Sequence, residues 1–127
     1  MLRKFLLLNP YRQIDHPAVF SYDEEKDEFH ISIKQGTRPS ELPAIPKVLM
    51  QKGVYEIDDK YARIFVKERV IPPERQNIGE IMRKVGITKY SEFALLEYCS
   101  GKSCMDDFYL EEITDDVNDL MKMNQFT

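Results

Sequence analysis

The segment Glu28-Phe29-His30-Ile31-Ser32-Ile33-Lys34 alternates polar and apolar side chains along its whole length. This period of two predicts a strand with one buried face, because successive side chains of a strand point to opposite sides. His30 is then expected to point away from the core. Residues 18–22 form a second strand-like run, and the intervening residues 23–27 are charged. Together the two runs predict a β-hairpin with an acidic loop.

Four other segments outside the hairpin have local signals of their own. Residues 2–8 predict a strand that stops at Asn9-Pro10. Residues 35–47 contain three prolines and one glycine, which predicts an ordered connector that is neither a long helix nor a central strand. Residues 61–71 fit either a strand or a short helix, and residues 106–113 fit either a short strand or a helical turn.

Two helices are predicted in the second half of the chain. The first opens at Pro72-Pro73, carries apolar residues at positions i, i+3, i+4 and i+7, and stops at Gly86. The second begins with Ser91 as its N-cap and is ended by Gly101.

A third helix is expected over residues 115–123, where three apolar residues share one face: Val117, Leu120 and Met121. These elements predict an α+β protein, in which a small antiparallel sheet from the N-terminal half packs with two to three C-terminal helices. We expect one domain over 1–127, with mainly strands and loops in 1–71 and mainly helix in 72–127.

Composition limits the class of protein. The chain has 127 residues, 43% hydrophobic and 31% charged, which is typical of a single soluble domain. The longest apolar run, residues 5–8, is too short for a membrane span of about 20 residues or for the core of a secretion signal. We therefore expect a cytoplasmic protein without membrane contact. Charge is uneven, because residues 60–104 carry a net +4 and the acidic tail 105–127 carries −6.

Motifs for chemistry are weak. Gly101-Lys102-Ser103 imitates the end of a phosphate-binding loop, but Leu96 stands where that loop needs its first glycine. Two cysteines, Cys99 and Cys104, are too few for a closed zinc site and are expected to be reduced. With only His16 and His30 present, we expect no histidine-dependent enzyme, no cofactor and no metal.

A set of residues in the second half of the chain follows the order Arg-x-Ile-Pro-x-x-Arg, a helix, Leu-Leu, Gly-x-Ser and Asp-x-Tyr. Its positions are Arg69, Ile71, Pro72, Arg75, Leu95, Leu96, Gly101, Ser103, Asp107 and Tyr109. This order resembles a pattern in the N-terminal subdomain of HipA-type protein kinases, the toxin kinases of bacterial toxin–antitoxin systems and their relatives, where the last part reads Asp-x-Tyr-Trp. The sequence departs from the pattern at Leu110, which replaces the tryptophan, and at Cys104, where leucine is usual.

The resemblance implies a stand-alone version of that subdomain, because 127 residues leave no room for the kinase core. In some of these systems, a separate small protein of this type binds and restrains the kinase encoded beside it. The leading hypothesis is therefore a non-enzymatic, antitoxin-like module that binds a HipA-type kinase. Arg69 and Arg75 would then be interface residues. Alternatively they are packing residues, because an arginine on either side of Pro72-Pro73 can satisfy carbonyls where proline removes pairing. The sequence does not predict the oligomeric state.

Two alternatives remain. A strand at 63–70 followed by two helices would resemble a ribbon-helix-helix DNA-binding regulator, with Arg63, Lys67 and Arg69 on one face of the ribbon. The acidic remainder of the chain makes DNA the less favoured partner. The acidic pairs that begin with Asp106-Asp107 would suit a small metal-dependent enzyme, although such pairs more often belong to a solvated surface.

Overall fold

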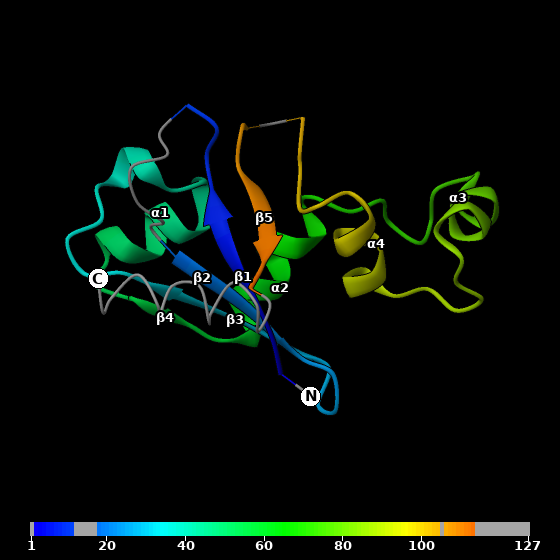
Figure 1. Cartoon of the computed structure of the whole chain (residues 1–127), viewed down its shortest axis with the longest axis horizontal. Coiled ribbons are helices and arrows are strands. Elements are labelled where there is room, and N and C mark those ends of the chain that lie inside the picture. Colours follow the sequence, from blue (N-terminus) through cyan, green and yellow to red (C-terminus); the bar gives the residue numbers. More distant parts are fainter. Residues whose placement is uncertain (1, 12–17, 105, 114–127) are drawn as a thin grey trace, which may run out of the picture.

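A five-stranded antiparallel sheet forms the centre of the computed structural model, which describes residues 2–11, 18–104 and 106–113 (Figure 1). Its strands are β1 (Leu2–Leu8), β2 (Ala18–Asp23), β3 (Glu28–Ile33), β4 (Glu56–Ile57) and β5 (Tyr109–Glu112). Their order across the sheet is β4-β3-β2-β1-β5. The predicted α+β class is confirmed, and one edge strand, β5, comes from the C-terminal half.

The hairpin predicted from the alternating sequence is present as β2 and β3. Its register places Phe20 opposite Ile31, so that both side chains enter the core. Asp27 takes a positive φ of 52° in the tight acidic turn, a conformation that aspartate tolerates better than most residues. Its carboxylate accepts a hydrogen bond of 2.6 Å from the Tyr22 hydroxyl, which ties the turn to the strand.

The helical elements are η1 (Pro39–Glu41), α1 (Ala44–Gln51), α2 (Asp59–Lys67), α3 (Ile78–Val85) and α4 (Glu92–Tyr98). Three of them, η1, α1 and α2, lie within residues 1–71, where we expected mainly strands and loops and had not predicted α1. The connector predicted over 35–47 ends earlier than expected, because α1 begins directly after Pro43. Pro46 lies in the first turn of α1, where a helix needs no N–H donor.

The ambiguous segment 61–71 is helical up to Lys67. The buried residues of α2 are Ala62, Phe65 and Val66, which fall at i, i+3 and i+4 on one helical face. Helix α2 begins after Asp58 and carries Asp59 in its first turn, where a negative charge interacts favourably with the helix dipole.

The predicted helix after Pro72-Pro73 starts later than expected. Residues 73–77 form turns, and α3 spans only Ile78–Val85. Its predicted end is confirmed, since Gly86 has a φ of 88°, the left-handed conformation that commonly closes a helix.

Helix α4 begins as predicted. The Ser91 hydroxyl accepts a hydrogen bond of 3.1 Å from the Ala94 N–H. The third predicted helix, over 115–123, lies outside the described residues.

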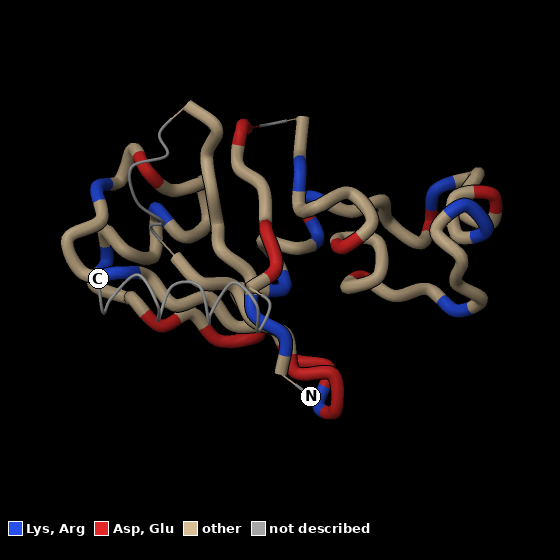
Figure 2. The backbone as a smooth tube through the Cα atoms, in the orientation of Figure 1, with Lys and Arg blue, Asp and Glu red and all other residues tan. Residues whose placement is uncertain are grey.

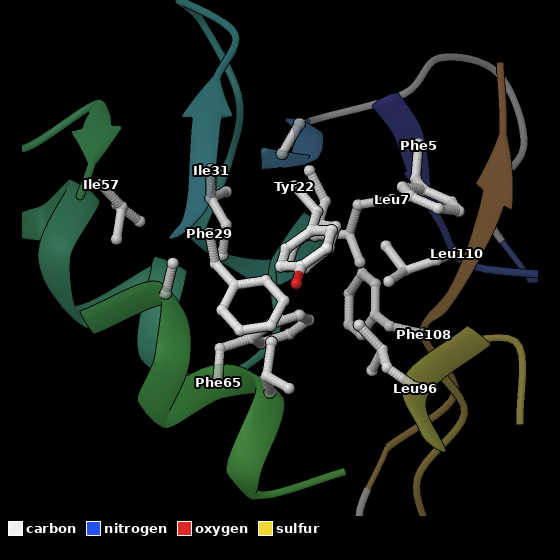
Figure 3. Close-up of a cluster of buried hydrophobic side chains, with 14 of the residues drawn as sticks. Phe5, Leu7, Tyr22, Phe29, Ile31, Ile57, Phe65, Leu96, Phe108 and Leu110 are labelled. Atoms are coloured by element: carbon white, nitrogen blue, oxygen red, sulfur yellow. The ribbon is translucent and has the colours of Figure 1, made fainter. Parts of the chain in front are cut away.

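One face of the sheet carries the hydrophobic core (Figure 3). Inward-pointing strand residues pack there with buried residues of α1, α2 and α4, so these helices cover this face. Aromatic rings fill its middle, and the rings of Tyr22 and Phe93 stack with centroids 4.1 Å apart. Burial of each such large apolar side chain contributes roughly 1.5–3 kcal/mol to folding.

The opposite face of the sheet carries the strand residues that alternate with the core positions, among them Leu6, Val19 and His30. His30 lies there as predicted and bonds Glu56 at 2.9 Å. None of the helices in the described ranges has the length and apolar character needed to cross a membrane.

Candidate functional site

Arg69 is a buried charged residue that sequence reasoning singled out. It follows α2, and only 3% of its side chain is exposed. Its guanidinium donates hydrogen bonds to the Gly101 carbonyl at 2.8 Å and to the Asp106 carboxylate at 2.5 Å. It also lies over the Phe65 ring, 4.5 Å from the centroid. Arg69 therefore joins the end of α2 to the loop between α4 and β5.

This loop needs glycine at position 101 for two reasons. The φ of Gly101 is 70°, and its N–H bonds the Leu96 carbonyl at 2.9 Å, which closes the end of α4. A Cβ at this position would lie 2.6 Å from Cγ of Leu110. The interpretation of Gly101 as a helix stop, rather than as part of a phosphate loop, agrees with this geometry.

The same loop borders a surface cavity of about 610 Å³. Ser103, Asp107 and Tyr109 contribute to its lining, and Ser103 forms an isolated bridge with Asp106. Five of the residues chosen from the sequence thus lie in or around one loop: Arg69, Gly101, Ser103, Asp107 and Tyr109. The cavity combines acidic residues with Lys102 and two aromatic residues.

Pro72 and Arg75 do not join this group. Both are exposed, and both lie in the turns between α2 and α3. Arg75 lines a different cavity of about 730 Å³, which includes Glu80 and Arg83 of α3. Arg69 satisfies the carbonyls of Gly101 and Phe108, which lie away from Pro72-Pro73, whereas Arg75 is exposed.

Two of the acidic residues near β5, Asp106 and Glu112, are engaged in ion pairs. Asp106 pairs with Arg69, and Glu112 accepts two hydrogen bonds from Arg3 at 2.7 and 2.8 Å. The hydrogen bonds from Arg3 lower the pKa of Glu112. Within residues 2–11, 18–104 and 106–113, no three histidine, cysteine or acidic side chains come together as a metal site. Asp115 and Asp116 lie outside these ranges.

Sequence reasoning missed Arg3. Its guanidinium also bonds Glu97 and lies 5.0 Å from the centroid of the Phe93 ring, so it links β1, β5 and α4. Arg3 and Glu112 are 109 residues apart, and no local pattern connects them.

The DNA-binding alternative requires an extended ribbon at 63–70, and the structure has helix α2 there up to Lys67. Arg63 is held by Asp59 at 3.0 Å and by the Asp27 carbonyl, while Arg69 is buried. The basic side chains proposed for a DNA groove therefore do not share one strand face. This expectation about the local structure was wrong.

The two cysteines are free thiols, with Cys104 exposed and Cys99 half-buried. The His30 ring forms a hydrogen bond with the Glu56 carboxylate, and His16 lies outside the described residues.

Helix α3 stands apart from the rest of the molecule. Two connecting segments carry it away from the sheet, so that residues 72–90 form an arm beside α4 (Figure 1). None of the eight residues of α3 is buried. Its four large apolar residues are only half-buried: Ile78, Ile81, Met82 and Val85. The Tyr90 hydroxyl bonds the Ile71 carbonyl at 2.8 Å and ties the two ends of the arm together.

The arm also differs from the body in charge. It carries four basic and two acidic residues, a net charge of +2, whereas the whole chain carries −4. Figure 2 shows lysine and arginine on α3 and a cluster of acidic residues at the tip of the β2–β3 hairpin. An amphipathic helix with a basic surround is well suited to dock on an acidic protein surface.

Comparison of the chain with protein-family models, curated proteins and solved structures found no match.

Proposed function

We propose that this protein is a non-enzymatic interaction module that binds and restrains a HipA-type kinase. The arm is the main support for this proposal. It presents α3, an amphipathic helix with no buried residue, at a place away from the sheet and its core. Such a helix gains stability when a partner covers its apolar face, which is the usual mode of helix-in-groove recognition. The kinase as partner comes from the sequence resemblance around Arg69 to Tyr109.

Two residues of that resemblance have structural roles next to the arm. Arg69 and Gly101 hold the loop after α4, and α4 is the helix beside which the arm lies. A rigid base of this kind limits the loss of conformational freedom on binding, which favours affinity.

The test is purification of the tagged chain from its own cells, with mass spectrometry of the proteins that co-purify. We expect a HipA-type kinase, and we expect its phosphorylation activity to fall when the purified chain is added. Recovery of no such kinase, or of one whose activity does not change, would overturn the proposal.

A matched pair of variants tests the arm as the docking surface. Ile81→Asp places a charge on the apolar face of α3, and Ile64→Asp places the same charge on α2, where Ile64 is 40% exposed. Loss of a central apolar anchor costs about 2 kcal/mol or more, a decrease of roughly 30-fold in affinity. We expect this loss for Ile81→Asp alone, with both variants folded by circular dichroism.

A further inference from the structure

A further cavity, of about 540 Å³, lies where the start of α1 meets the end of α2 and the loop before β5. Ala44 lines it from α1, Arg69 from the end of α2, and Asp106 and Phe108 from the loop. Its volume is within the range of roughly 300–1,000 Å³ that is usual for small-molecule sites. All of its lining residues lie outside the arm, so this cavity is separate from the surface proposed to bind a kinase.

Arg69 brings an unused hydrogen-bond donor to this cavity. Its Nε–H and Nη2 donate along the same edge of the planar guanidinium. Nη2 donates to Oδ2 of Asp106, but Oδ1 of Asp106 accepts from the Phe108 N–H at 2.9 Å instead of from Nε. Among the residues that the structure describes, the Nε–H of Arg69 has no acceptor, and only 3% of this side chain is exposed. Because Arg69 and Asp106 both line the cavity, an oxygen atom bound there would supply the acceptor.

The start of α1 brings further donors to the same place. The first N–H groups of a helix have no partner within the helix. In α1, no side-chain cap and no acidic residue of the first turn satisfies them in the described part of the chain. Lys47, one turn into α1, also lines the cavity. A helix N-terminus acts as about half a positive charge, so these groups together favour a bound anion.

The other charges of the lining limit the charge of that anion. Glu68 and Asp106 balance Lys47 and Arg69, which leaves only the partial positive charge of the helix N-terminus. A single negative charge matches this environment better than the two charges of a phosphate group. The apolar part of the lining is Leu42, Pro43, Ala44 and Phe108.

We propose that this cavity binds a small organic carboxylate. One carboxylate oxygen accepts the hydrogen bond from Arg69 Nε–H, the N–H groups at the start of α1 and the Lys47 ammonium hold the other, and the apolar body of the ligand packs on Leu42 and Phe108. This arrangement uses the buried donor that the fold leaves without an acceptor. It also uses a helix N-terminus that the chain itself does not cap.

NMR of the full chain tests the proposal, with benzoate as the probe at pH 7 and constant ionic strength. The ¹H–¹⁵N signal of Arg69 Nε–H, assigned through its bonds to the backbone, reports directly on the unused donor. We expect benzoate to shift this signal in a saturable way, with a Kd of about 1 mM or tighter, and to slow its exchange with water. Benzamide, which has the same shape without the charge, should bind at least about tenfold more weakly.

A matched pair of variants locates the site on α1. Lys47→Gln should weaken benzoate binding about threefold or more, whereas Lys52→Gln, the same change at the other end of the helix, should leave it within about twofold. An Nε–H signal that benzoate does not shift, or equal effects of the two variants, would overturn the proposal. Phosphate binding more tightly than benzoate would overturn the assignment to a carboxylate. The experiment needs no kinase, so its result is independent of the proposed function.

Discussion

The buried ion pair between Arg69 and Asp106 gives a prediction with a measurable size. Arg69→Met keeps the length and most of the volume of the side chain but removes the guanidinium. Only 3% of the Arg69 side chain is exposed. The Gly101 carbonyl and the Asp106 carboxylate would then lose the donors at 2.8 and 2.5 Å. Removal of one partner of a buried ion pair lowers the free energy of unfolding by about 3–5 kcal/mol.

The expected loss for Arg69→Met is at the lower end, about 3 kcal/mol of the free energy of unfolding, because 25% of the Asp106 side chain can reach water. Urea unfolding followed by circular dichroism measures it. Arg75→Met is the control, since Arg75 is exposed, and we expect a change within about 0.5 kcal/mol.

A loss below about 1 kcal/mol for Arg69→Met, or one equal to that of Arg75→Met, would refute the reasoning. If Arg69→Met does not fold, Asp106→Asn tests the same pair. It keeps an acceptor for Arg69 but leaves the buried guanidinium without a counter-charge, so we expect a loss of about 3 kcal/mol.

Three further changes test other parts of the fold by the same unfolding measurement. Gly101→Ala should cost about 2 kcal/mol or more, because its Cβ would lie 2.6 Å from Leu110 Cγ at a φ of 70°; a neutral result would contradict this. Ser91→Ala should cost about 1 kcal/mol through loss of the cap of α4, and an unchanged midpoint would exclude that role. Hydrogen bonds from Arg3 lower the pKa of Glu112 below its ordinary 4.5. Its contribution is therefore present above that value and lost as pH falls through the lower folded pKa, so Glu112→Gln should lose less stability on acidification than the wild type, and equal losses would argue against it.

Local patterns predicted the elements whose causes are local. The alternation through Phe29, Ile31 and Ile33 predicted β3 because one face of a strand is buried, and this holds whatever covers it. Gly86 and Ser91 predicted a helix end and a helix start because their chemistry acts on the adjacent turn.

Segment 61–71 was ambiguous because β-branched and aromatic residues suit either a strand or a buried helical face. The spacing of Asp59 and Arg63, four residues apart, was a usable signal, since such pairs stabilise helices. Pro46 led to the prediction of a connector where the structure has the first turn of α1. Proline breaks the interior of a helix but is accepted in its first turn.

The candidate site was predictable only in part. Resemblance selected Arg69 and Gly101, but the distance of 32 residues between them hides the hydrogen bond that they form. The helical spacing of apolar residues in α3 predicted an apolar face, and such a face is normally buried. The position of α3 on an arm depends instead on the lengths and turns of its two connecting segments, and the spacing of apolar residues does not predict these.

The position of β1 has a consequence for how the chain folds. β1 lies between β2 and β5. During synthesis β2 follows β1 after a short segment, whereas β5 follows about a hundred residues later. Until Tyr109–Glu112 are synthesised, one edge of β1 has unpaired N–H and C=O groups that another chain can pair with. Closure of the sheet is a long-range and therefore late step, and crowded nascent chains should aggregate through this edge before it closes.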